Sequence, residues 1–368
     1  MFLAKHHYAI ELAKKGNKVY FLNPPDEKKT NQKKSIEIIP TEQKNLWLVK
    51  HKLWFPYNIK FHAISFFHFL MGFHIRKIIK KIGEPINIIW SFDLGNIYPF
   101  RFFGERPYKI FHPVDEPLNK EAIDSARGSD IIFSVTKEIL EKYQHYSVPK
   151  FFINHGVSEA FFSGNAIESN DKPIHVGFSG NLLRNDIDRE TVLKIVRKNQ
   201  DIFFDFFGSY TQKQSNISGS ADEGTKTFIQ TLQSFSNVKL HGVLPHEKLA
   251  LSLHKMDAFL ICYDIKKDQS KGTNYHKIME YLSTGKIIVS NNVTTYQDKP
   301  NLLLMSKNRE DNHELPNLFR EAIDNINFHN NALLREERMD FARNNTYQKQ
   351  IKRIAQFIDK KNSDLSYQ

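Results

Sequence analysis

The chain of 368 residues is long enough for two domains, each with its own hydrophobic core. Hydrophobic residues make up 40% and charged residues 25% of it, which is typical of a soluble globular protein. The single cysteine, Cys262, excludes an internal disulfide framework and a multi-cysteine metal site, and it fits a reducing compartment. No run approaches the roughly 20 apolar residues of a membrane span, and no secretory segment follows Met1, so we predict a cytoplasmic protein.

The formal net charge is +11, and basic residues gather in one part of the chain. Between residues 44 and 109 there are eleven Lys and Arg residues against three acidic ones, with many aromatic residues among them. Such a surface suits an anionic membrane or nucleic acid, and we favour the membrane. We predict that Ile59–Ile82, which ends in a basic cluster, is a helix at the inner face of a membrane, with the protein peripheral there. The alternative is a buried aromatic helix whose basic end is solvated; we expect no nucleic acid partner.

Helical and strand-like patterns alternate from the start of the chain. The first helical segment is Leu3–Lys15, and Gly16 ends it. Short runs rich in β-branched and aromatic residues then predict parallel strands that are covered on both faces. These strands are Lys18–Leu22, Ile86–Phe92, Lys109–Val114, Asp130–Val135 and Lys150–Asn154. Helical patterns between the later strands are Leu118–Arg127 and Lys137–His145.

The same alternation restarts after a polar stretch at Ser163–Lys172. The predicted strands are Ile174–Ser179, Phe203–Phe207, Val238–His241, Asp257–Tyr263 and Ile287–Ser290. The helices between them are Ile187–Asn199, Thr225–Phe235, His246–Met256 and Asn274–Thr284. Residues Thr211–Gly224, which are polar with few apolar positions, predict a loop insertion.

Two consecutive βαβ series predict an α/β fold of two Rossmann-like domains that face each other across a cleft. We place the N-terminal domain at residues 1–165 and the C-terminal domain at residues 173–330. Residues 331–368 are helical and are expected to pack back toward the N-terminal domain. A doubly wound domain ordinarily opens with a strand, whereas this chain begins inside a helix, so we expect the first strand to be absent from this sequence.

The most informative segment runs from Lys271 to Ser290. It predicts a polar loop, a short helix capped by Asn274, a glycine that ends the helix, and an apolar strand. Lys277 and Glu280 lie three residues apart and are neighbours on one helical face. A lysine near a helix N-terminus suits a diphosphate, and a carboxylate one turn deeper suits a pair of sugar hydroxyls. The alternative is a surface Lys–Glu pair on an ordinary helix.

Four stretches in order carry a family resemblance. They are Asp130–Val135 followed by Phe152-Ile-Asn-His-Gly156-Val157, then Val176-Gly-Phe-Ser-Gly180-Asn181-Leu182, then Asn237-Val-Lys-Leu-His-Gly242, and finally Lys271–Ser290. Together they cover roughly residues 130–293. In this order and spacing, the chain resembles the two-domain GT-B glycosyltransferases, closest to the retaining family 4.

The resemblance implies that a nucleotide diphosphate sugar binds to the C-terminal domain as a co-substrate. The donor-binding residues that it implies are Gly180, Asn181, Arg184, Gly208, Gly272, Thr273, Asn274, Lys277 and Glu280. Arg184 and Lys277 would neutralise the leaving diphosphate, which makes them catalytic candidates, and Glu280 would accept from the ribose hydroxyls. Gly272 stands where the family has the first of two carboxylates. The loop at Gly272 is therefore expected to meet the sugar through backbone N–H groups.

The N-terminal domain offers one further catalytic candidate. Asp93 follows the predicted strand Ile86–Phe92, where a carboxylate can orient an acceptor hydroxyl or cap a helix. No cluster of His, Asp and Glu has metal-ligand spacing, so we expect no metal and no further cofactor.

These features predict a hexosyltransferase, retaining by resemblance, that acts on a saccharide or lipid-linked acceptor in cell-surface polysaccharide synthesis. One alternative is a nucleotide-sugar 2-epimerase, which shares the architecture and has no acceptor. Another is a non-catalytic protein that binds sugar nucleotides.

Overall fold

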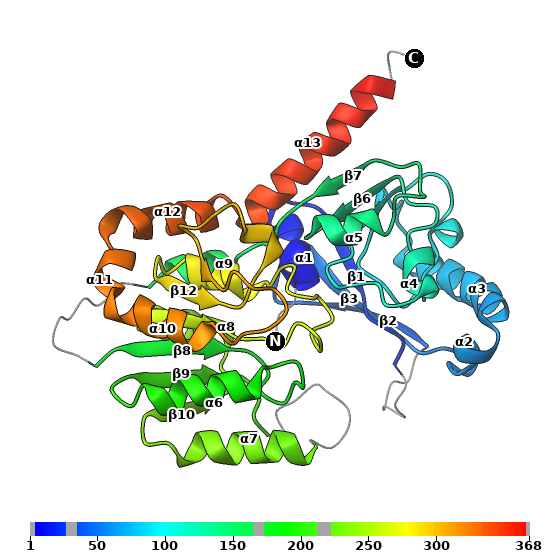
Figure 1. Cartoon of the computed structure of the whole chain (residues 1–368). Coiled ribbons are helices and arrows are strands. Elements are labelled where there is room, and N and C mark those ends of the chain that lie inside the picture. The colour runs from blue at the N-terminus through cyan, green and yellow to red at the C-terminus, as the bar shows by residue number, and fades with distance from the viewer. Residues whose placement is uncertain (1–3, 27–34, 165–172, 212–221, 366–368) are drawn as a thin grey trace. The chain divides into compact units, whose positions relative to one another are not determined.

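The computed structural model describes residues 4–26, 35–164, 173–211 and 222–365, with side chains up to residue 359 (Figure 1). It divides the chain into an N-terminal unit, Phe2–Asn154 with Tyr347–Gln368, and a C-terminal unit, His155–Thr346. Both units are α/β with parallel strands, as the sequence predicts. Most of the polar stretch Ser163–Lys172 and most of the loop Thr211–Gly224 lie outside the described residues.

The unit boundary differs from the domain boundaries expected from the sequence, because the helical tail is shared. Helix α12 (Ala332–Arg343) belongs to the C-terminal unit. Its fully buried Arg338 donates hydrogen bonds to the carbonyl oxygens of Gly285 at 3.1 Å and His329 at 2.8 Å. Helix α13 (Tyr347–Leu365) belongs to the N-terminal unit, where it packs against α1 (Ala4–Lys14).

The C-terminal unit is built on a six-stranded sheet whose paired strands are all parallel. In chain order the strands are β8 (His175–Ser179), β9 (Phe203–Phe207), β10 (Val238–Gly242), β11 (Ala258–Ile261), β12 (Ile287–Ser290) and β13 (Leu304–Met305). In space their order is β10-β9-β8-β11-β12-β13, so the first strand lies in the middle of the sheet. Strands β11 and β12 are buried at every position, which explains why their sequences are continuous apolar runs.

Besides α12, the other helices of the unit connect these strands, precede β8 or follow β13. They are α6 (Arg189–Lys198), α7 (Glu223–Ser234), α8 (His246–Leu253), α9 (Lys277–Leu282), α10 (Leu315–Asp324), α11 (Ile326–His329), η2 (Glu159–Phe162) and η4 (Thr294–Tyr296). Aspartates begin two of the helices: Asp188 accepts a hydrogen bond from Thr191 N in α6, and Asp222 accepts one from Thr225 N in α7. A single large cluster of buried side chains unites these helices with the sheet.

The N-terminal unit holds two sheets. Strands β4 (Ile88–Ser91), β5 (Tyr108–Phe111), β6 (Ile131–Ser134) and β7 (Lys150–Phe152) form a parallel sheet in sequential order. Strand β1 (Val19–Leu22) pairs in parallel with β3 (Leu46–His51), which pairs antiparallel with β2 (Ile36–Pro40). The short elements α4 (Lys120–Asp124), α5 (Lys137–Glu141) and η1 (Phe100–Phe103) complete the unit. Strands β2 and β3 were not among the predicted elements.

The basic and aromatic stretch of the N-terminal unit forms two helices. Helix α2 (Ile59–His62) ends at Ala63, and α3 (Ile64–Ile82) follows directly and ends at Gly83, whose φ is 71°. One face of α3, with Phe67, Met71 and Ile75, is buried. Among the described residues no helix has the length and apolar character needed to cross a bilayer.

Candidate functional site

The order of the C-terminal sheet defines where a ligand is expected. Strand β8 lies between β9 and β11. The strands that follow β8 in the sequence are therefore added first on one side of it (β9 and β10) and then on the other (β11, β12 and β13). In open parallel sheets, ligands bind outside the carboxyl ends of the strands at this switch point. The residues that follow β8 and β11, including Gly180 and Tyr263, therefore lie at the expected site.

Two glycines bring the backbones after β8 and β9 close together. Gly180 N donates to the carbonyl oxygen of Phe207 at 2.8 Å. Gly208 has a φ of +134°, and a Cβ atom at this position would lie 1.9 Å from the carbonyl oxygen of Gly180. A Cβ atom on Gly180 (φ +155°) would lie 2.8 Å from Lys277 Nζ. Both positions thus require glycine, and both leave the strand ends bare of side chains.

Lys277 is the buried cation of this site. It is the first residue of α9, and its Nζ donates to the carbonyl oxygen of Ser179, the last residue of β8, at 2.6 Å. Nζ also donates to the Tyr263 hydroxyl and lies 4.8 Å from the centre of that ring. Among the described residues no carboxylate forms an ion pair with Lys277, and burial lowers the pKa of its ammonium group.

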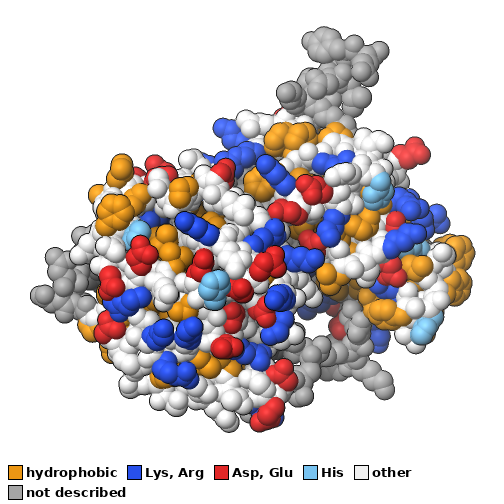
Figure 2. Space-filling model, in the orientation of Figure 1, with side chains coloured by type: hydrophobic (Ala, Val, Ile, Leu, Met, Phe, Trp, Pro, Cys, Tyr) orange, Lys and Arg blue, Asp and Glu red, His pale blue; other side chains and the backbone are white. Residues whose placement is uncertain are grey.

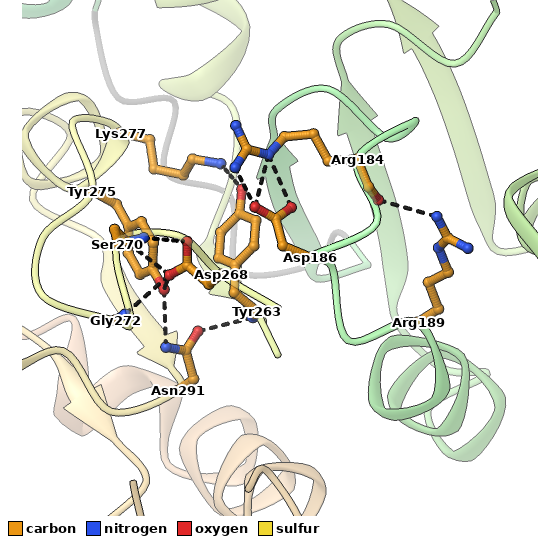
Figure 3. A network of polar contacts seen from close by, with 10 residues as sticks. All are labelled: Arg184, Asp186, Arg189, Tyr263, Asp268, Ser270, Gly272, Tyr275, Lys277 and Asn291. Atoms are coloured by element: carbon orange, nitrogen blue, oxygen red, sulfur yellow. Dashed lines mark hydrogen bonds and ion pairs between the residues drawn. The ribbon is translucent and has the colours of Figure 1, made fainter. Parts of the chain in front are cut away.

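Arg184 lies beside this lysine but has a partner of its own. Its Nε donates to both carboxylate oxygens of Asp186 at 2.9 Å, and this contact raises the pKa of the guanidinium. Asp186 is buried, whereas the Arg184 side chain is 45% exposed. Figure 3 shows Arg184, Lys277 and Tyr263 pointing toward one another. The structure therefore brings both predicted cations together and shows that Asp186 compensates the charge of one of them.

Glu280 lies one turn after Lys277 on α9 and is half-buried. Within the described residues its side chain makes no hydrogen bond or ion pair. Removal from water raises its pKa to about 7. A carboxylate with free acceptor positions suits the paired hydroxyls of a ribose, and this role of Glu280 stays a prediction.

The loop before α9 is organised by Asp268, a residue that the sequence analysis missed. Its carboxylate accepts from Gly272 N at 3.0 Å, from the Ser270 hydroxyl at 2.6 Å and from the Tyr275 hydroxyl at 2.7 Å (Figure 3). Asn291 lies beside this group, and its Oδ1 accepts from Tyr263 N at 3.0 Å. The position of Asp268 four residues before a glycine, in a polar loop, is the local signal for such a turn.

Gly272 has a structural reason to be glycine. Its φ is +65°, and a Cβ atom would lie 2.5 Å from Ile265 Cδ1 and 2.7 Å from the carbonyl oxygen of Asn292. Its N–H donates to Asp268, and the N–H of Thr273 donates to the carbonyl oxygen of Ser270 at 3.0 Å. Both N–H groups are therefore used inside the loop, and contact of the loop with the donor sugar stays a prediction.

Asn274 does not cap the helix, contrary to the prediction. Helix α9 begins at Lys277, and the residue before it, His276, makes no side-chain cap hydrogen bond. Asn274 lies buried in the preceding loop. Asn181, another predicted donor residue, is half-buried after β8, and its Oδ1 accepts from Leu183 N at 3.0 Å. Asn181 thus shapes the turn that follows Gly180.

Asp93 belongs to the N-terminal unit, where it holds the loop after β4. Its Oδ1 accepts from Gly95 N at 2.8 Å, and its Oδ2 accepts from Ile97 N at 2.7 Å and Tyr98 N at 3.3 Å. Both carboxylate oxygens therefore serve the loop, which favours the capping alternative over contact with an acceptor. Its catalytic role stays a prediction. No group of three His, Cys, Asp or Glu side chains within the described ranges is arranged to hold a metal ion.

No protein-family model matches the sequence, and no curated protein matches it significantly. Solved structures do match the fold. A sucrose-phosphate synthase from Thermosynechococcus elongatus has a TM-score of 0.68 at 11% identity, covering 98% of this chain and 93% of its own. An α,α-trehalose-phosphate synthase (UDP-forming) from Burkholderia xenovorans, in complex with glucose-6-phosphate, has a TM-score of 0.69 at 10% identity, covering 98% and 96%.

The likeness extends over nearly the whole length of both proteins. The chain has the GT-B fold. A third GT-B structure, Anabaena HepE in complex with UDP and glucose, has a TM-score of 0.59 at 11% identity and covers 93% of this chain and 99% of its own. In GT-B terms, the site around Lys277 lies on the C-terminal Rossmann-like unit, where the sequence resemblance places the donor. Tyr263 and Asp186 belong to this site but were not among the predicted site residues. Tyr263 is the last residue of a predicted strand, whereas nothing in the sequence singled out Asp186.

Proposed function

We propose that this protein is a glycosyltransferase that moves a hexose from a nucleotide diphosphate sugar to a saccharide or lipid-linked acceptor. The GT-B fold and the resemblance to the retaining family 4 support this proposal, and the resemblance favours retention at the anomeric carbon. We place the reaction in the cytoplasm and in cell-surface polysaccharide synthesis, as the sequence predicts.

The observation that carries the proposal is the buried ammonium group of Lys277. It lies at the switch point of the sheet, it donates to two neutral oxygens, and no described carboxylate pairs with it. A buried cation that forms no ion pair is costly, so an anionic ligand is its natural partner. The glycine at position 180 supports this, because a Cβ atom there would lie 2.8 Å from Lys277 Nζ and would crowd the ammonium group that the anion is proposed to meet.

The chemistry assigned to the site is stabilisation of a leaving group. When the bond between the anomeric carbon and the diphosphate oxygen breaks, negative charge grows on the diphosphate. Lys277 and Arg184 offset this charge, while the acceptor oxygen bonds to the anomeric carbon and its proton passes to the oxygen of the departing diphosphate. Glu280 holds the nucleotide through the ribose hydroxyls. Of the bases, we propose uracil, because the solved Anabaena protein contains UDP.

Calorimetry of the full chain against UDP, GDP, ADP and CDP tests the donor site. We expect one of these diphosphates, UDP first, to bind. Glu280→Ala should weaken binding about tenfold or more, because a charge-assisted hydrogen bond is lost. Glu247→Ala, at an exposed glutamate on α8, is the matched control and should leave the affinity unchanged.

The outcomes separate the proposal from its alternatives. If no nucleoside diphosphate binds, the donor site is overturned. If a nucleotide sugar is converted to its epimer without any acceptor, the epimerase is favoured. If nucleotide binds but no donor is turned over with any acceptor, a non-catalytic binding protein is favoured.

A further inference from the structure

Helices α2 and α3 and the loop before them carry an unusual set of exposed aromatic side chains. Five of them, between 43% and 68% exposed, are Trp54, Phe61, Phe66, Phe69 and Phe73. Along α3 they recur at intervals of three and four residues, so they lie on one helical face, and Phe69 meets Phe73 edge to face at 5.0 Å. We call Trp54 together with the outer faces of α2 and α3 the aromatic face. Apolar patches of this kind on a protein surface mark interaction sites.

The aromatic face cannot turn inward, because the opposite face of α3 is already packed. Phe67, Met71 and Ile75 are fully buried in one cluster. A Cβ atom on Gly72 would lie 2.7 Å from the ring of Phe102, so α3 packs closely against η1 at this point. The exposed rings are therefore held outward by the fold and are not a frayed helix end.

Basic side chains continue the same face toward the end of α3. Arg76, Lys77, Lys80 and Lys81 are exposed, and Ile59–Ile82 contains no acidic residue. The Arg76 guanidinium lies 5.6 Å from the Phe73 ring, and Lys77 Nζ lies 5.6 Å from the Trp54 ring. None of these four cations forms an ion pair with a described residue. Figure 2 shows hydrophobic and basic side chains side by side over α2 and α3.

We propose that the aromatic face binds the surface of an anionic lipid bilayer. A helix that lies in a membrane interface places aromatic rings among the acyl chains and lysines among the lipid phosphates, and both groups are present here on one face of α3. The positive charge is unpaired within the described residues, so it complements anionic headgroups. Phenylalanine rings have no hydrogen-bonding group, which suits hydrocarbon better than the polar rim of a protein partner.

Sedimentation of the full chain with lipid vesicles tests this proposal without any nucleotide, so its result is independent of the donor site. We expect binding to vesicles that contain phosphatidylglycerol and little binding to pure phosphatidylcholine. The triple variant Lys77→Ala, Lys80→Ala, Lys81→Ala should lower the partition coefficient about 100-fold at low salt. Phe69→Ser with Phe73→Ser should lower it about tenfold or more.

Matched controls lie in the C-terminal unit. Lys239→Ala, Lys248→Ala, Lys255→Ala removes three exposed lysines, and Phe328→Ser removes a ring that is 67% exposed; neither variant should change vesicle binding. Equal losses from the control and test variants would overturn the proposal. So would self-association of the chain, measured by sedimentation velocity, that Phe69→Ser with Phe73→Ser abolishes while no vesicle binding is found.

Discussion

The Lys277 ammonium group donates to the carbonyl oxygen of Ser179 at 2.6 Å, which joins α9 to the carboxyl end of β8. The same group donates to the hydroxyl of Tyr263, at the end of β11. One buried amine thus contacts both strands that flank the switch point of the sheet. Neither contact supplies negative charge, so folding alone does not explain why the position holds a cation.

Replacing this cation separates a role in folding from a role in binding. We expect Lys277→Met to keep or raise the melting temperature, because it removes a buried charge that forms no ion pair. The same variant should lose nucleotide affinity and lower kcat about 100- to 1,000-fold, since a group that stabilises the leaving charge is gone. Scanning calorimetry and donor turnover measure the two effects. Lys239→Met, at an exposed lysine on β10, is the control; a large loss of stability with normal affinity would instead make Lys277 structural.

The pKa of Glu280 predicts a pH dependence of stability. Burial raises this pKa from its ordinary value of 4.5 to about 7 in the folded protein. Between these values the unfolded chain has lost the proton that the folded chain keeps, so the free energy of unfolding falls as pH rises from about 4.5 to about 7. Glu280→Gln should remove this fall, which urea titrations across the range measure. A variant with the parent's slope would show that Glu280 does not titrate in this window.

The same group predicts how nucleotide affinity depends on pH. Ribose hydroxyls donate to the ionised carboxylate, so affinity should rise as pH passes through about 7. Glu280→Gln should bind more weakly and with a flat profile. Calorimetry with UDP at several pH values checks this expectation, and a profile of the parent that is flat through neutral pH would contradict it.

Much of the fold was readable from the sequence, because buried parallel strands leave continuous apolar runs. Phe203–Phe207 and Ile287–Ser290 were predicted with the bounds that the structure gives. Strands β2 and β3 were missed because the basic residues around Trp47 and Lys50 were interpreted as surface. In the structure the alternate residues Val49 and His51 of β3 are buried on one face, while Lys50 between them is exposed.

The sequence predicted which residues lie at the candidate site better than it predicted the contacts of their side chains. A glycine at a strand end pointed to Gly180, because parallel strands bring their carboxyl ends to one edge, and the start of a predicted helix pointed to Lys277. The partners were not predictable, since the ion pair of Arg184 with Asp186 depends on side-chain conformation. The role of Gly272 also needed coordinates: only the position of Asn292 shows that no side chain fits there.

The contact between Arg184 and Asp186 predicts that the two residues act together on the nucleotide. Asp186→Asn should keep or raise nucleotide affinity, because Arg184 stays cationic and loses a neutralising neighbour. Arg184→Gln should lower affinity, because it leaves the buried Asp186 charge near the phosphates. The double variant should fall between the two, and calorimetry on all four proteins gives the coupling. Additive effects would show that Arg184 does not act on the nucleotide through this pair.

The close approach of Gly208 to Gly180 predicts a sharp difference between two glycine substitutions. Gly208→Ala should destabilise the protein by about 3 kcal/mol or more, because its Cβ would lie 1.9 Å from a backbone oxygen that cannot move away cheaply. Gly83 also has a positive φ, +71°, in the left-handed helical region, but a Cβ there would meet no atom closer than 4.0 Å, so Gly83→Ala should cost only about 1 to 2 kcal/mol. Denaturant titration compares the two variants. Equal losses of stability would mean that the backbone after β8 can move to make room for a side chain at position 208. The backbone at this strand end would then not be held in a fixed position for a phosphate.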